Sequence, residues 1–481
     1  MRPRAARGVA LLGVTLLALA AAGPAPSLDE VLLLGDAPAS VRAHLFARAA
    51  RLEGEQPDEA AQALRHAARS FERAGLRDSA IATLRRALAL RKDAGDHLTL
   101  ADLLLRRRQE GDTSEAITVL ESVKAAGFAD RSAFAHTTGL LAWAHRLAGR
   151  PDAAYATLKP ASAALLRETE WRYRVARILL DGGRFQEAFQ AVRPLAVEAR
   201  LQDAEVSELL RQIGDASGVG QVSAEIERDV LDGDKRDLAA LTAFGGRRVR
   251  FFAADGFGLG GVLVVPDRPG PRPGVIVLAN PGDEATDYDS LAVGLRAADF
   301  AVLVLDVRGS GWSVAPSCPL MDTWEGRHER LLGLAAGDIR VAWNYLAAAT
   351  TLDTTCFAVV ATRYAAPIAA AAVANDPGVA AFVLVSPRCE PVERGPLRAC
   401  IAERKLPLFL EASAEDNRET ELYEAWYQAS DRGASRFVEG QGPSGALLFR
   451  RDPGEISRIA QWLDGSFTAF ARRGARPTRR R

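Results

Sequence analysis

Four short stretches of the chain repeat a glycine followed five residues later by an alanine, and this spacing constrains the fold more than any other feature. The pairs are Gly75 with Ala80, Gly111 with Ala116, Gly149 with Ala154, and Gly183 with Ala188. Successive glycines lie 36, 38 and 34 residues apart, which is the period of helix-turn-helix repeats. Glycine closes a helix readily because it accepts a left-handed conformation, and alanine lets the next helix pack closely. The sequence therefore predicts a helical repeat array over 40–235.

After residue 245 the pattern changes to apolar runs that alternate with amphipathic helices. Strands are predicted at 247–254, 259–266, 274–280, 301–307, 356–362, 380–386, 406–412 and 435–440. The interior runs are rich in Val, Leu and Ile, as in a sheet that helices cover on both faces. The alternation predicts a doubly wound α/β sheet over 245–470, parallel except for an antiparallel pair at its start.

The first 22 residues have the three parts of a secretory signal peptide. Arginines at positions 2, 4 and 7 precede an apolar run over 9–22, and Ala20 and Ala22 form a cleavage site. The run is shorter than the roughly 20 residues of a membrane-spanning helix, although an uncleaved anchor is the alternative. We therefore expect export to the periplasm or the extracellular space.

The cysteines and the charges limit the other classes of function. Export permits disulfides among Cys318, Cys356, Cys389 and Cys400; Cys389 and Cys400 could close a small loop, three full pairings exist, and buried free thiols are equally compatible. No CxxC or Cys/His cluster is present, so we expect neither a metal nor a cofactor. Lys and Arg balance Asp and Glu at 61 each, which gives no indication of nucleic-acid binding. The basic tail over 471–481 is predicted to be disordered, either solvated or in peripheral contact with an envelope surface.

The glycine-alanine repeats resemble the tetratricopeptide repeat family. That resemblance implies a concave surface that binds a protein or peptide partner. The alternative is that these helices only pack against the domain that follows.

The segment "VLVLDVRGSGWS" at 302–313 contains Asp306, Arg308, Gly309, Gly311 and Ser313 after a strand. It resembles the D-x-R-G-x-G-x-S segment of α/β-hydrolases, and the whole of 245–470 resembles the esterase branch near dienelactone hydrolases and acetyl xylan esterases. The resemblance implies a nucleophile after the strand at 356–362, followed along the chain by an acid and a histidine.

The nucleophile position of this resemblance falls on Arg363, in "VVATRYAAP". A guanidinium stays protonated and cannot attack a carbonyl. Ala361 and Ala365 replace the two flanking glycines, which argues against the strained turn that such a nucleophile occupies. Thr362 is one residue away and is expected to point away from the site.

Of the other two triad positions, one matches the residue type of the family and the other does not. Asp416 matches the acid, whereas Ser444 stands in the loop that usually holds the histidine. The chain has six histidines and none after His328, so a histidine that follows the acid is absent. His328 would have to act as a relocated base.

The loop that normally supplies oxyanion contacts is also altered. Asn280, Pro281 and Gly282 replace the usual His-Gly. Pro281 has no N–H to donate, which leaves the amides of Gly282 and Asp283 as candidates.

These observations lead to the hypothesis of an exported binding or scaffolding protein with a catalytically inactive α/β-hydrolase fold, a pseudoenzyme, and a protein-binding repeat domain. The candidate ligand-pocket residues are Asn280, Gly282, Arg363, Tyr364 and Asp416. Arg363 is expected to pair with Asp416, to hold an anionic ligand or to reach solvent. The alternatives are an active serine-type esterase or peptidase with relocated catalytic residues, and a purely structural role.

Overall fold

The computed structural model describes residues 27–32, 38–218, 222–268, 270–321, 324, 328–413, 419–440 and 442–474. The chain divides into two compact units. One comprises 1–195, 212–219 and 325–328, and the other comprises 196–211, 220–324 and 329–481. No helix within the described ranges is both long enough and apolar enough to span a membrane.

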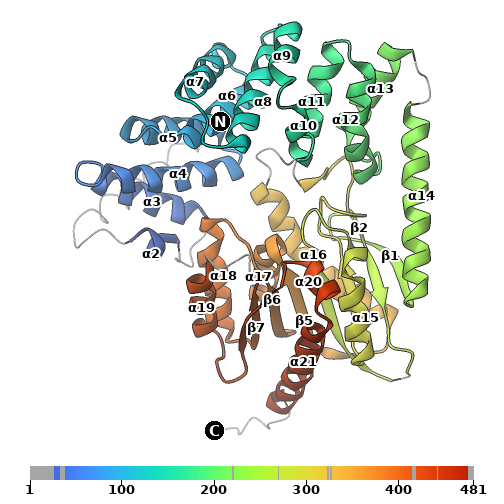
Figure 1. Cartoon of the computed structure of the whole chain (residues 1–481). Coiled ribbons are helices and arrows are strands. Elements are labelled where there is room, and N and C mark those ends of the chain that lie inside the picture. Colours follow the sequence, from blue (N-terminus) through green and yellow to red (C-terminus); the bar gives the residue numbers. More distant parts are fainter. Residues whose placement is uncertain are drawn as a thin grey trace, which may run out of the picture. The chain divides into compact units, whose positions relative to one another are not determined.

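The part of the chain before residue 244 is helical throughout its described ranges, as predicted (Figure 1). Its helices are α2 (Leu28–Leu32), α3 (Pro38–Leu52), α4 (Pro57–Arg73), α5 (Arg77–Leu90), α6 (Ala94–Arg107), α7 (Asp112–Ala126), α8 (Arg131–Leu147), α9 (Pro151–Leu158), α10 (Ser162–Leu165), α11 (Thr169–Asp181), α12 (Phe185–Glu198), α13 (Ala204–Ser217) and α14 (Val222–Ala243). Consecutive helices pack against one another from α3 to α9.

The repeated glycines and alanines have the roles that their spacing predicts. Gly75, Gly111, Gly149 and Gly183 have φ of 75°, 87°, 71° and 72°, so each adopts the left-handed conformation between two helices. The four alanines that follow are completely buried. Each turn therefore brings a small side chain into the contact between neighbouring helices.

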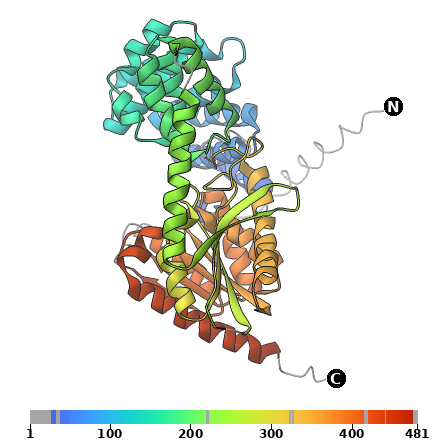
Figure 2. The same ribbon diagram turned by 90° about the vertical axis from the view of Figure 1, so that its right-hand side faces the viewer.

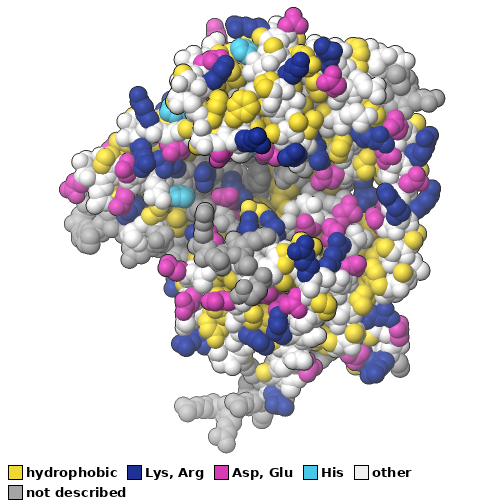
Figure 3. Space-filling model, viewed as in Figure 1, with side chains coloured by type: hydrophobic (Ala, Val, Ile, Leu, Met, Phe, Trp, Pro, Cys, Tyr) yellow, Lys and Arg dark blue, Asp and Glu magenta, His cyan; other side chains and the backbone are white. Residues whose placement is uncertain are grey.

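The charged run at 106–108 connects helices of the repeat region. Arg106 pairs with Asp102 on its own helix and with Glu72 on α4, and Arg107 pairs with Asp78 and Asp112. On the face seen in Figure 3, basic and acidic side chains are similarly interspersed. Arg106 and Arg107 are therefore engaged in local ion pairs.

The second unit contains an eight-stranded sheet in the order β1-β2-β4-β3-β5-β6-β7-β8. Its strands are β1 (Gly246–Phe252), β2 (Gly258–Val264), β3 (Arg272–Leu278), β4 (Ala301–Leu305), β5 (Leu352–Thr362), β6 (Val379–Val385), β7 (Leu408–Ala412) and β8 (Arg436–Glu439). Strand β2 runs antiparallel to β1 and β4, and all other pairs are parallel. The predicted strands and the antiparallel start are confirmed. Helix α14 contacts β1, and both face the viewer in Figure 2.

Helices cover both faces of this sheet. They are α15 (Asp289–Ala297), α16 (His328–Ala349), α17 (Ala366–Asn375), α18 (Pro391–Arg404), α19 (Thr420–Ala429), α20 (Ala446–Arg451) and α21 (Pro453–Gly474). Along β5, Val359 joins the apolar core that contains α16–α19, whereas Val360 joins the core that contains α15 and α21. The strand is buried on both sides, which explains its unbroken apolar sequence.

No disulfide joins Cys389 to Cys400, the pair considered for a small closed loop. The Cys389 and Cys400 thiols are free, and burial raises the pKa of both, that of Cys400 to about 12. Cys318 and Cys356 are buried in the core.

Candidate functional site at the end of strand β5

Strand β5 ends at Thr362, and one turn of 3-10 helix (Arg363–Ala365) leads directly into α17. Arg363 has φ of 46°, a left-handed conformation that residues with a side chain seldom adopt. The expectation that alanines at 361 and 365 disfavour this strained turn is wrong. The positive φ falls on Arg363 itself, while Ala365 has φ of −75°, so neither flanking position requires glycine.

The Arg363 side chain contacts the residue in the predicted histidine position. Its Nη1 donates a hydrogen bond of 3.0 Å to Oγ of Ser444, a buried residue in the loop before α20. Its Nε is buried and has no acceptor among the described residues. Asp416, one of the partners considered from the sequence, lies outside the described residues.

The backbone amide that follows the nucleophile position is engaged by Asn280. The Tyr364 N–H donates to Asn280 Oδ1 at 3.1 Å, while Asn280 Nδ2 donates to the Pro281 carbonyl at 2.8 Å. In α/β-hydrolases the amide after the nucleophile is an oxyanion-hole donor. The Asp283 amide, another candidate donor, is bonded to the Asn280 carbonyl at 2.9 Å.

A buried tyrosine, Tyr288, joins the loop after β3 to the end of β5. Its hydroxyl donates to Asp283 Oδ2 at 2.9 Å, lies 2.6 Å from Thr362 Oγ1 and accepts from the Asn280 amide at 3.0 Å. Burial, followed by the charge of Asp283, raises the pKa of Tyr288. Burial also raises the pKa of Asp283. Thr362 is fully buried in this network.

The sequence analysis missed Tyr288 because a single tyrosine between a strand and a helix carries no motif. Its role depends on Thr362, which is 74 residues away along the chain.

The D-x-R-G-x-G-x-S segment holds the loops around this site in place. Asp306 is completely buried and accepts from the amides of Ala285 at 2.6 Å and Trp312 at 3.0 Å. Burial raises the pKa of Asp306 to about 7. A Cβ at Gly311 would lie 2.5 Å from the Asp306 carboxyl carbon, so only glycine fits there.

Arg308 in the same segment is the centre of a buried ion-pair network. It makes paired hydrogen bonds to Asp338 at 2.6 and 2.8 Å and to Asp255 at 2.8 Å each. Such fork-like contacts fix the position of the guanidinium. The segment is therefore a structural support for the strand ends.

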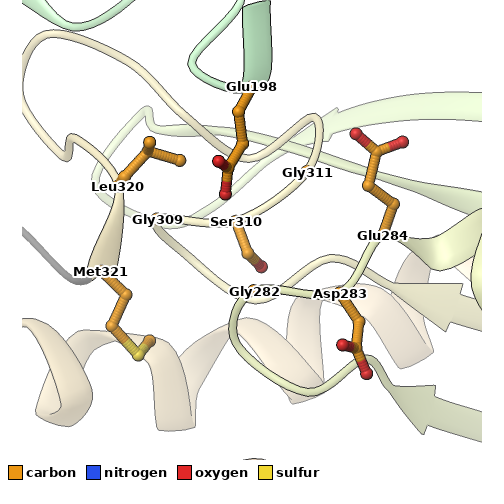
Figure 4. A pocket seen from close by; sticks show the side chains of 9 residues that line it. All are labelled: Glu198, Gly282, Asp283, Glu284, Gly309, Ser310, Gly311, Leu320 and Met321. Carbon is orange, nitrogen blue, oxygen red and sulfur yellow. The ribbon is translucent and has the colours of Figure 1, made fainter. Parts of the chain in front are cut away.

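A small cavity of about 100 Å³ lies between the loops that follow β3 and β4. It is lined by Glu198, Gly282, Asp283, Glu284, Gly309, Ser310, Gly311, Leu320 and Met321 (Figure 4). The Glu198 side chain, from the end of α12, reaches toward Ser310, whereas the Asp283 side chain points away from Ser310. Of the predicted pocket residues that the structure describes, only Gly282 lines this cavity, and its carboxylates were not predicted from the sequence.

Three further predicted features lie wholly or partly outside the described residues. His328 begins α16, but its side chain lies outside the described residues, as do the signal segment and most of the basic tail. The described part of the site therefore consists of Arg363, Tyr364, Asn280 and Ser444 with their supports.

The strand order, the antiparallel β2 and the sharp turn after β5 together decide the fold of the second unit. It has the α/β-hydrolase fold. No protein-family model matches the sequence, and no curated protein is similar to it.

Solved structures of hydrolases are similar to part of the chain. DcsB in complex with its substrate analogue is 11% identical over 46% of this chain and 99% of that chain, with a TM-score of 0.38. An esterase from Pyrococcus furiosus is 16% identical over 46% and 91%, with a TM-score of 0.35. An acylaminoacyl peptidase from Pyrococcus horikoshii is 12% identical over 46% of this chain and 41% of that chain, with a TM-score of 0.34. The fold assignment depends on the strand order and not on these values.

Proposed function

We propose that the α/β-hydrolase unit is a noncatalytic binding module, a pseudoenzyme. The observation that carries this proposal is the hydrogen bond from Arg363 Nη1 to Ser444 Oγ. In an active enzyme of this fold, a serine and a histidine meet at these two positions. A guanidinium can neither attack a carbonyl nor accept a proton, and a serine hydroxyl is a poor substitute for imidazole as a base.

Two independent features support the same conclusion. No histidine follows residue 328 in the sequence, so none comes after the acid position. The Tyr364 amide, which would stabilise an oxyanion, already donates to the Asn280 side chain. A substrate carbonyl would have to displace the Asn280 side-chain oxygen before the Tyr364 amide could polarise that carbonyl.

The retained turn suits the binding of an anion. Arg363 is half-buried at the carboxyl end of the sheet, where open α/β sheets place their ligands. The adjacent Tyr364 side chain is 44% exposed and supplies an aromatic surface beside the charge. A carboxylate, such as the acid product of an esterase, is the ligand class that matches a guanidinium with this neighbour.

For the helical region we propose a tetratricopeptide-type array that binds a protein or peptide partner. The regular glycine turns and the buried alanines support this reading. The leader-like first 22 residues support an exported protein that acts in the cell envelope.

The first experiment tests catalysis directly. The wild-type protein and an Arg363→Ala variant are treated with a fluorophosphonate serine probe and with short acyl esters, and a known serine esterase serves as positive control. For both forms we expect labelling and turnover no higher than the signal of the solvent blank. Turnover that survives repurification, or a labelled residue, would establish the alternative of a hydrolase with relocated residues.

The second experiment tests the ligand class. Butyrate is titrated into the wild type, Arg363→Ala and Arg451→Ala, the last a control at an exposed arginine on α20. We expect binding by the wild type and the control and loss of binding in Arg363→Ala. Equal binding by all three forms would exclude Arg363 as the anion contact.

A further inference from the structure

Three potential metal ligands from two separate segments of the sequence meet in the helical unit. His136 lies on α8, and Glu168 and Glu170 lie at the start of α11 (Figure 1). One ligand atom from each residue lies within 4.8 Å of the other two. His136 Nε2 is 2.7 Å from Glu168 Oε2, although the residues are 32 positions apart in the sequence.

The imidazole is held in a defined orientation. The His136 ring stacks on Trp171, with centroids 5.8 Å apart and an interplanar angle of 16°. Trp171 is itself buried and packs closely against α8, because a Cβ at Gly139 would lie only 2.7 Å from its ring. The stacking presents Nε2 toward the two carboxylates.

The Glu168 and Glu170 carboxylates lie close to each other, so their negative charges repel. The neighbouring Arg174 lies over the Trp171 ring and forms its ion pair with Asp102 at 2.8 Å. A divalent cation between the three ligands would relieve the repulsion between the two glutamates.

We propose that His136, Glu168 and Glu170 bind a divalent transition-metal ion, for which zinc has the best-matching chemistry. One imidazole nitrogen and two carboxylate oxygens are a ligand set that zinc accepts, with water in the fourth position. Bonds of about 2.0–2.2 Å would place the ligand atoms about 3.4 Å apart. Rotation of the two glutamate side chains provides this closure, while the ring stays on Trp171.

A bound ion would join α8 to α11 across the intervening helices α9 and α10. Since an unfolded chain does not hold these ligands together, binding would stabilise the folded helical unit. The sequence has no closely spaced cysteines and histidines of the kind that mark many metal sites. For this reason no metal was predicted from the sequence. Calcium and magnesium prefer sites made of oxygen ligands alone.

The test uses the full chain, freed of metal with a chelator and dialysed. Zinc chloride is titrated by calorimetry into the wild type, His136→Ala, Glu170→Gln and Glu187→Gln. The last is the matched control, an exposed glutamate in the first turn of the next helix, α12. We expect one ion per chain in the wild type and in the control, and at least a tenfold weaker affinity in the other two variants.

Two further measurements separate a metal site from a simple His136–Glu168 ion pair. Cobalt substitution should produce visible d–d absorption bands in the wild type that His136→Ala loses. Zinc should raise the melting temperature of the wild type and of Glu187→Gln, but not that of Glu170→Gln, a variant at an exposed position that retains the ion pair. Absence of zinc binding, equal affinity in all four proteins, or binding of magnesium and not zinc would each overturn the proposal.

Discussion

Arg363 Nη1 lies 3.0 Å from Ser444 Oγ, so the two residues that the sequence resemblance assigns to the nucleophile and histidine positions of a hydrolase are hydrogen-bonded to each other. They are 81 residues apart in the sequence. The contact occurs because the chain keeps the left-handed turn after β5, which directs the residue at its tip toward the loop before α20. A sharp turn with a left-handed residue at Arg363 thus joins β5 to α17.

The turn after β5 should carry a measurable conformational cost. A left-handed residue with a Cβ costs about 1–2 kcal/mol, so Arg363→Gly should be more stable than Arg363→Ala by about 1 kcal/mol, although both lose the bond to Ser444. Chemical denaturation of both variants measures the difference. Lys405→Gly and Lys405→Ala are the matched pair for comparison. Lys405 follows the last residue of α18 and, like Arg363, is left-handed, with φ of 47°. An Arg363→Ala variant as stable as the glycine variant would mean that the turn relaxes.

Gly311 should tolerate no side chain, because a Cβ would meet the buried Asp306 carboxyl and φ is 49°. We expect Gly311→Ala to destabilise the protein by about 3 kcal/mol or more through overpacking and strain. Gly333→Ala is the control, within α16 and with no atom within 4 Å of the added Cβ. It should stabilise the protein by about 0.5–1 kcal/mol. Melting temperatures of the two variants that shift in the same direction would contradict this account.

Tyr288 should be important for its hydroxyl as well as its ring. Tyr288→Phe leaves the half-buried Asp283 and the buried Thr362 without their common partner, which should cost about 1–3 kcal/mol. Tyr364→Phe, at a side chain that is 44% exposed, should change stability by less than about 0.5 kcal/mol. Urea denaturation compares the two. An equally small effect at both positions would show that water replaces the Tyr288 hydroxyl.

Glu411 should make stability depend on pH. It is buried on β7, and burial together with the neighbouring buried Glu455 raises its pKa from 4.5 to about 9. The folded chain therefore keeps a proton that the unfolded chain releases, so this contribution to stability is complete below pH 4.5 and is lost as the pH rises toward 9. Glu411→Gln mimics the protonated form and should be more stable than the wild type by on the order of 2 kcal/mol at pH 8.

The measurement for Glu411 is the melting temperature from pH 5 to pH 9. Over this range the melting temperature of the wild type should fall more steeply with pH than that of Glu411→Gln. A control variant, Glu439→Gln on the neighbouring strand β8, is exposed and should follow the wild type. Parallel curves for the wild type and Glu411→Gln would show that Glu411 is ionised in the folded protein at neutral pH.

The sequence predicted the elements well because their signals are local. An unbroken apolar run such as β5 indicates a strand covered on both faces, and the repeated glycines mark the helix ends at Gly75 and its equivalents. The turn at Arg363 was mispredicted because the argument relied on the flanking alanines. The backbone conformation there is set by the strand and helix that the turn connects, which the two alanines do not oppose.

By itself, the sequence determined the order of helices and strands and the absence of a histidine after residue 328, because both follow from residues taken in order. Only the tertiary structure decided that Arg363 meets Ser444 and that Asn280 binds the Tyr364 amide, across 81 and 84 residues. The same holds for His136 with Glu168 and Glu170. Periodicity records which face of an element is buried, but not which distant side chains meet there; that depends on the packing of the whole unit.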